Sequence, residues 1–462
     1  MALAMLFGYI SMGLLLAAFL RSQFKYLQRL FFPSCILAGF ILLLLGPSLL
    51  SIINIPAAGA GGLVYILLAA LFAALGLRGF ALKMAGRETA AITALLTKGL
   101  AFQGVIGLLF TLLLIVLVSA DFFAGFGSLL MFGFGYDTLL ARIFGGYWEK
   151  SLGFAGGGAI GYSFGILGLL FSYLLGLFMV ARAVKKSGAP LFAEGDDPSF
   201  LSGFAPRGEA KPSPDRMTTK QQSIETLSFH FALIGLALLI TFAVIRLVGL
   251  ILIRLFGSSV ADLVEILMNL QFLLAFAAGA VMRKLALRCK VDHVIDEGTI
   301  GRIIALLVDF MVVAAIISIP LVISRVHLWE ILTLALIGAA LTFLLVPLST
   351  RLMFSEESLT RQVALFAFLT GNISSSVALL RIMDPRLENP LIGHLALAGG
   401  LVMVTGLPLW CLVNLPLVAD NPLYIVVAAV LMILYGGLWY LAWHFLINRK
   451  VETEASGEDV KS

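Results

Sequence analysis

The feature that most constrains this chain is a series of apolar segments, each long enough to cross a lipid bilayer as a helix. A spanning helix needs about 20 mostly apolar residues. Hydrophobic residues make up 61% of the sequence and charged residues 12%, which excludes an ordinary soluble domain. We therefore predict an all-α polytopic membrane protein. The eleven candidate spans are 2–20, 30–53, 62–80, 90–118, 156–182, 227–255, 259–282, 303–324, 328–353, 391–418 and 422–447.

A polar stretch divides the chain into two apolar halves. Residues 185–226 hold five of the fifteen prolines together with many charges, so they bury too little apolar surface to order themselves. The first span has no basic n-region and no small-residue cleavage site, and we expect it to be retained. The predicted order is a first transmembrane repeat (1–184), the linker, a second repeat (227–420), an extra helix (421–447) and a tail (448–462).

The basic residues lie in short clusters at the ends of apolar segments, which predicts orientation in a membrane. They form no basic face, so we expect no nucleic acid partner despite the net charge of +5. With these clusters inside, the N-terminus is outside a cell (inner) membrane, and the linker and C-terminus are cytoplasmic. The clusters used are Arg21, Lys25 and Arg29; Arg78, Lys83 and Arg87; Arg182, Lys185 and Lys186; Arg283, Lys284, Arg288 and Lys290; and Arg351.

This orientation predicts a re-entrant or broken segment in each half. Helix 90–118 ends outside and helix 156–182 begins there, so residues 122–150 must enter and leave from one side. Residues 363–385 lie between two cytoplasmic ends by the same reasoning. Five spans plus one such segment in each half, with opposite entry sides, indicate an inverted repeat. The last helix is an addition that returns the tail to the cytoplasm.

The two irregular segments contain the candidate binding residues, because broken backbone at membrane depth is tolerated where it lines a cavity or is buried in protein. Amides at a half-helix N-terminus suit a carboxylate, and exposed oxygens suit sodium. Asp137, Thr138 and Asn372 are the predicted sodium ligands. In the alternative interpretation, Gly133 and Gly135 only allow close helix packing. The remaining candidates are Tyr136, Thr370, Gly371, Ser374, Ser375 and Ser376.

Other polar residues inside apolar segments have two possible roles. Asp309 binds a coupling ion or forms a structural ion pair, since an ionisable group in a membrane needs a partner. Arg142 and Arg381 receive a substrate carboxylate or anchor the interface. Lys98 and Glu265 are expected near helix ends, whereas Asn269 and Gln271 are expected to bridge helices.

Several phrases resemble the bacterial sodium/glutamate symporter family. They are Leu27–Gly39 (LQRLFFPSCILAG), 71–79 (LFAALGLRG) and Tyr147–Phe154 followed by ARAVKKSG. The likeness covers residues 20–190 in sequence and most of the chain in architecture. The family has Gly-His-Gly-Thr where this chain has Gly-Tyr-Asp-Thr (135–138), and it has an Ala-Thr-Pro-Thr phrase that is missing here. The resemblance implies a homodimer that works by alternating access.

Together these features predict sodium-coupled symport of glutamate or a related small carboxylate. The alternatives are a symporter of another organic anion and a transporter-like membrane scaffold without transport activity. An enzyme is not expected, because the five histidines are scattered and no H-E-x-x-H or G-x-S-x-G motif occurs. The three cysteines show no C-x-x-C spacing. Sodium is the only ion expected, and no cofactor is expected.

Overall fold

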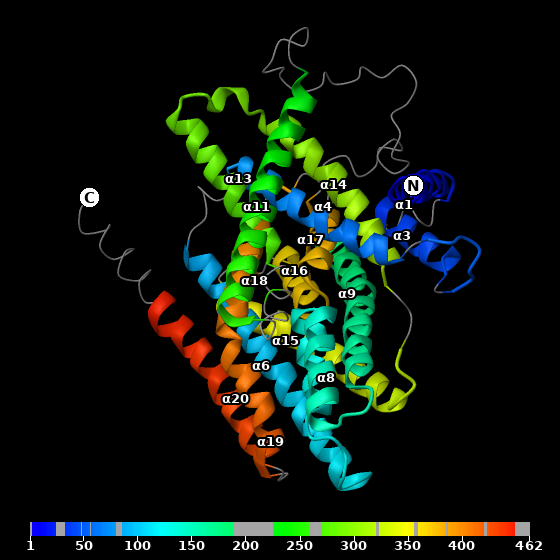
Figure 1. Ribbon diagram of the computed structural model, residues 1–462, viewed down its shortest axis with the longest axis vertical. Coiled ribbons are helices and arrows are strands. Elements are labelled where there is room, and N and C mark those ends of the chain that lie inside the picture. Colours follow the sequence, from blue (N-terminus) through cyan, green and yellow to red (C-terminus); the bar gives the residue numbers. More distant parts are fainter. Residues whose placement is uncertain are drawn as a thin grey trace. The chain divides into compact units, whose positions relative to one another are not determined.

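The computed structural model describes most of the chain as helices (Figure 1). Most of the predicted linker, the C-terminal tail, Lys25, Arg29, Lys83, Glu265 and Asn269 lie outside the described residues. Within the described part, the secondary structure is helical and contains no strand. The described residues are 2–24, 33–47, 49–55, 57–79, 86–187, 225–257, 264, 270–319, 323–354, 359–384, 387–419 and 423–448.

Nine helical segments in the described part are long and apolar enough to cross a membrane. Each carries at least 18 residues, and this confirms an all-α chain with many membrane-spanning helices. The nine are Leu3–Gln23, Gly59–Leu77, Gly86–Leu117, Gly157–Arg182, Thr226–Phe256, Glu297–Ile317, Leu328–Met353, Leu391–Leu417 and Leu423–Phe445.

Two predicted spans form shorter helices. The segment predicted at 30–53 contains α3, which has only 12 residues (Ser34–Leu45). This helix ends because Gly46 adopts an extended conformation and Pro47 follows it. The segment predicted at 259–282 overlaps α13 (Gln271–Arg288), which has 18 residues. Basic residues in the last turns of α13 shorten its apolar part.

The chain divides into two compact units, and each contains residues from both halves of the sequence. Unit 1 comprises Met1–Lys83, Met179–Leu321 and Leu380–Gly393. Its central helix, α4, packs against α13 and α14. A side chain at Gly76 would collide with the Phe276 carbonyl, so glycine allows α4 and α13 to approach closely. The main helices are α1 (Ala2–Gln23), α3, α4 (Ala57–Leu77), α11 (Thr226–Phe256), α13 and α14 (Glu297–Ile317), with a short η4 turn (Asp292–Val294).

Unit 2 comprises Met84–Phe178, Val322–Leu379 and His394–Ser462. Its long helix α6 packs against α15 and α20, and α20 also packs against α19, its neighbour in Figure 1. The helices α9, α17 and α18 each contain residues of both units. The elements are α6 (Gly86–Leu117), η1 (Phe126–Ser128), α7 (Leu129–Met131), η2 (Phe132–Tyr136), α8 (Thr138–Leu152), α9 (Gly157–Ser187), α15 (Leu328–Met353), α16 (Leu359–Thr370), α17 (Ile373–Met383), α18 (Leu391–Thr405), α19 (Leu407–Ala419), α20 (Leu423–Ala442) and η5 (Trp443–Asn448).

Candidate functional site

The first predicted break is the tip of a helical hairpin, called hairpin 1 (residues 126–152). Its first arm runs from η1 through η2, and its second arm is α8. The rings of Phe132 and Phe144 stack with centroids 4.0 Å apart, and Phe123 lies 5.8 Å from Trp148. Contacting residues on the two arms are therefore farther apart in the sequence when they lie farther from the tip. The two arms are antiparallel, and the chain returns towards the end from which it came.

Asp137 forms the turn of hairpin 1 because its backbone leaves the helical conformation there. It has an extended backbone, with φ −178° and ψ 161°, and it caps α8. Its carboxylate oxygen Oδ1 accepts hydrogen bonds from the Thr138 backbone amide at 2.6 Å and from the Thr138 hydroxyl at 2.9 Å. The carboxylate thus satisfies one amide that the helix start leaves unpaired.

The second break has the same form, and we call it hairpin 2 (residues 359–383). Its arms, α16 and α17, are joined by Gly371 and Asn372. The Ser376 hydroxyl donates to the Ala364 carbonyl at 2.6 Å, and the Ser375 hydroxyl donates to the Ala367 carbonyl at 3.0 Å. These bonds hold the two arms antiparallel. The Ser375 and Ser376 hydroxyls therefore stabilise the hairpin itself.

The tips of both hairpins belong to unit 2 and meet there. The Asn372 side chain lies close enough to the Asp137 carboxylate to interact with it. The Asn372 oxygen Oδ1 meanwhile accepts from the Ser375 backbone amide at 3.1 Å. The structure thus brings two of the predicted sodium ligands, Asp137 and Asn372, into direct contact, with Thr138 beside them.

Helix α9 provides the space for this meeting through two glycines. A Cβ atom at Gly165 would lie 2.6 Å from the Cα atom of Thr138, which is closer than real atoms pack. A Cβ atom at Gly168 would collide with the Thr370 carbonyl and with the Phe134 ring. Both tips therefore pack closely against α9 at Gly165 and Gly168.

Solvent exposure separates the candidate residues into two groups. Asp137, Thr138 and Asn372 are partly exposed. The others are buried: Gly133, Gly135, Tyr136, Thr370, Gly371, Ser374, Ser375 and Ser376. The accessible residues at the tips therefore all carry side-chain oxygens, which are the donors that hard cations prefer. Among the described residues, no group of three or more histidine, cysteine, aspartate or glutamate side chains could hold a metal ion.

One further residue at this site, Gln103 on α6, was not predicted. Its amide nitrogen Nε2 donates to the Leu369 carbonyl at 2.7 Å and to the Thr342 hydroxyl at 3.2 Å. The side chain is fully buried, and its oxygen Oε1 has no hydrogen-bond partner among the described residues. A Cβ atom at Gly135 would lie 2.9 Å from that oxygen. The signal in the sequence that pointed to Gln103 was a single amide side chain within a long apolar helix.

The structure places Asp309 in unit 1, so it is not brought together with Asp137 and Asn372 within one unit. Its carboxylate pairs with the Arg381 guanidinium at 2.9 Å, and Arg381 also donates to the Ala305 carbonyl. Of the two roles considered for Asp309, this geometry matches the structural ion pair. Arg381 is accordingly engaged by α14 instead of being free for a substrate carboxylate.

Two other polar residues can be compared with their predicted places. Lys98 was expected near a helix end, but it lies well inside α6, so that expectation was wrong. Its amine is 3.3 Å from the Ser349 hydroxyl and 5.3 Å from the centroid of the Tyr440 ring. Gln271 bridges α13 and α4 as expected, because its amide donates to the Tyr65 carbonyl at 2.6 Å.

Comparison with known proteins adds no family assignment. No protein-family model matches the chain, and neither a curated protein nor a solved structure matches it significantly. The resemblance to bacterial sodium/glutamate symporters therefore rests on the sequence phrases alone. The functional argument depends on the hairpin tips.

Proposed function

We propose that this protein is a secondary active transporter that couples sodium entry to the uptake of glutamate or a related small carboxylate. The observation that carries the proposal is the meeting of two hairpin tips at a partly exposed carboxylate, Asp137. Irregular backbone with oxygen ligands, placed among apolar helices, is the usual form of an ion and substrate site in such transporters. The proposal places this site in unit 2.

The charges at the tips suit a sodium ion together with an anion. The Asp137 carboxylate and the Thr138 hydroxyl supply oxygens for sodium. The N-terminus of α17 carries partial positive charge and lies next to Asn372. The negatively charged Asp137 caps α8, whereas the neutral Asn372 caps α17, so the start of α17 is the better place for the substrate carboxylate. Gln103 adds a buried acceptor close to hairpin 1.

The proposal includes an inverted repeat, and the pairing of helices supports it. If α3 corresponds to α13 and α4 to α14, then the contact of α3 with α14 has a counterpart in that of α13 with α4. If α6 corresponds to α15 and α7 to α16, the contact of α6 with α7 likewise corresponds to that of α15 with α16. Each unit then combines equivalent elements of both halves, as alternating access requires.

The remaining parts of the proposal concern the membrane and the assembly. The protein resides in the inner cell membrane as a homodimer, with the N-terminus outside and the linker and tail in the cytoplasm. Impermeant labelling of a cysteine introduced at position 210 in intact cells would contradict this orientation.

Uptake of labelled glutamate into proteoliposomes tests the function directly. The wild-type protein is expected to take up glutamate only with an inward sodium gradient. Asp137→Asn should raise the sodium concentration needed for half-maximal uptake by about tenfold or more, which is ~1.4 kcal/mol of sodium binding. Asp121→Asn is the matched control, because Asp121 is exposed and outside both hairpins.

Three results would contradict the proposal. Uptake that is absent with every cation gradient and every small carboxylate would exclude the transport activity. Uptake that does not depend on sodium would exclude the coupling ion. An unchanged sodium dependence in both Asp137→Asn and Asn372→Ala, with folded protein, would exclude the hairpin tips as the sodium site.

A further inference from the structure

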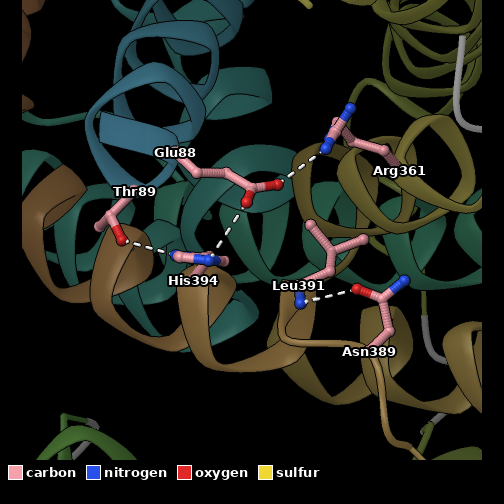
Figure 2. A network of polar contacts seen from close by, with 6 residues as sticks. All are labelled: Glu88, Thr89, Arg361, Asn389, Leu391 and His394. Atoms are coloured by element: carbon pink, nitrogen blue, oxygen red, sulfur yellow. Dashed lines mark hydrogen bonds and ion pairs between the residues drawn. The ribbon is translucent and has the colours of Figure 1, made fainter. Parts of the chain in front are cut away.

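A second cluster of titratable residues lies in unit 2, apart from the hairpin tips in the sequence (Figure 2). Glu88 lies between Arg361 and His394. One carboxylate oxygen is 2.7 Å from the Arg361 guanidinium, and the other is 3.2 Å from the His394 nitrogen Nε2. The second ring nitrogen, Nδ1, is 2.8 Å from the Thr89 hydroxyl. We call Glu88, His394 and Arg361 the triad.

The triad joins the first turns of three helices. Glu88 and Thr89 are in the first turn of α6, Arg361 is in the first turn of α16, and His394 is in the first turn of α18 (Figure 2). Helix α16 is the first arm of hairpin 2, whose tip carries Asn372. A change in the charge of the triad therefore acts on the base of an arm that positions the proposed binding site.

The charges of the triad balance when the His394 imidazole is neutral. Glu88 then contributes one negative charge and Arg361 one positive charge. His394 is almost completely buried, with 2% of its side chain exposed, so a second positive charge would lack solvation. The charged groups that face the imidazole are Glu88 from α6 and Arg361 from α16. Burial and the charge balance therefore favour the neutral imidazole in this arrangement.

The cluster can nevertheless accept a proton, because each hydrogen-bond partner of the His394 ring can pair with both the neutral and the protonated imidazole. In the neutral form, Nε2–H donates to Glu88 and Nδ1 accepts from the Thr89 hydroxyl. In the protonated form, the same hydroxyl rotates and accepts from Nδ1–H. Glu88 has 30% of its side chain exposed, so water can reach the cluster.

His230 in unit 1 provides a contrast. Its nitrogen Nδ1 lies 2.7 Å from the Thr226 carbonyl, which can only accept, and Nε2 accepts from the Asp296 backbone amide at 2.8 Å. A backbone amide cannot turn into an acceptor, so protonation of His230 would break that bond. Of these two buried histidines, only His394 has partners that tolerate both states.

We propose that the triad is a proton-binding site in unit 2, and that proton uptake disfavours the conformation in which His394 is buried between Glu88 and Arg361. An exposed histidine titrates at about pH 6.5. The triad conformation is therefore favoured above that range and is lost as the pH falls through it. The link between this proton and the transport rate rests on the proposed function, whereas the proton site itself does not.

The test compares the wild-type protein with His394→Gln, which keeps hydrogen-bonding groups but cannot titrate. Thermal unfolding of the purified full-length protein is measured between pH 5 and pH 8. The wild-type Tm should fall with decreasing pH more steeply than that of the variant. His327→Gln is the matched control, because His327 also lies near a glutamate, at 3.6 Å from Glu330, but has 35% of its side chain exposed. It should follow the wild type.

The same proteins are then reconstituted, and uptake is measured over the same pH range. One proton can change the population of the triad conformation by at most about tenfold per pH unit. The wild-type uptake rate should therefore change with pH within that limit, and His394→Gln should remove the change. Parallel Tm profiles of wild type and His394→Gln would overturn the proton site. A changed Tm profile with an unchanged uptake profile would overturn the link to transport.

Glu88→Gln provides an independent variant if His394→Gln does not fold. It removes the carboxylate that stabilises a protonated imidazole but keeps an acceptor in the same place. The midpoint of the Tm profile should then move to lower pH by about one unit or more. A midpoint that does not move, or that moves to higher pH, would overturn the proposal. Failure of uptake in the wild type at every pH would refute only the transport function, because the Tm profiles still test the proton site.

Discussion

The ion pair between Asp309 and Arg381 allows a decisive test of the role of Asp309. Replacing Arg381 with Met removes the guanidinium but keeps a long apolar side chain. The variant leaves the Asp309 carboxylate without its cationic partner, and it also removes the hydrogen bond to the Ala305 carbonyl. The double variant Arg381→Met/Asp309→Leu removes both charges.

The expected destabilisation can be estimated from the surroundings of the pair. Removing one partner of a buried pair costs about 3–5 kcal/mol. Asp309 has 36% of its side chain exposed and Arg381 has 18%, so the pair is not fully buried. The Cys35 thiol also lies near the Asp309 carboxylate and remains in the variant. We therefore expect a smaller loss of stability than for a fully buried pair, about 2–3 kcal/mol for Arg381→Met.

Thermal unfolding of the purified proteins measures this effect. A loss of about 2–3 kcal/mol should lower the Tm by several degrees. The double variant should recover most of this loss, because no unpaired carboxylate remains, and its sodium-driven uptake should stay close to wild type. If the double variant has normal stability but no sodium dependence, Asp309 is a coupling-ion ligand and the assignment as a structural pair is wrong.

Two further predictions concern Gln103 and Glu225. Gln103→Leu should reduce uptake at least tenfold, which corresponds to ~1.4 kcal/mol or more. Equal uptake in the wild type and the variant would refute a role at the site. Hydrogen bonds from Ser228 and Leu227 lower the pKa of Glu225, so its capping of α11 is present above the usual glutamate range and is lost as the pH falls through the lowered value. The protection of the Leu227 and Ser228 amides from exchange, relative to the intrinsic exchange rate at each pH, should fall in acid, and Glu225→Gln should abolish that fall. The same pH dependence of protection in the variant would contradict the assignment.

Several features of the fold could be predicted from the sequence because they depend on local properties. Apolar segments of sufficient length must be helical in a bilayer, since backbone groups have no other partners there. The breaks near Asp137 and Asn372 were also predictable, because glycine and short polar side chains end helices locally. The limits of the spans were less predictable. Segment 30–53 contains only a 12-residue α3, and its end at Gly46 depends on the local backbone conformation.

The tertiary structure alone decided which polar groups meet. Asp137 and Asn372 are more than 200 positions apart in the sequence, and their contact depends on how the two hairpins pack against α9. The same holds for Gln103 with Leu369, for Asp309 with Arg381 and for Glu88 with His394. In the sequence alone, each of these residues has several possible partners. Only the packing of distant helices selects a partner for each group. Burying a polar group without a hydrogen-bond partner costs free energy, so the helices pack in a way that supplies one.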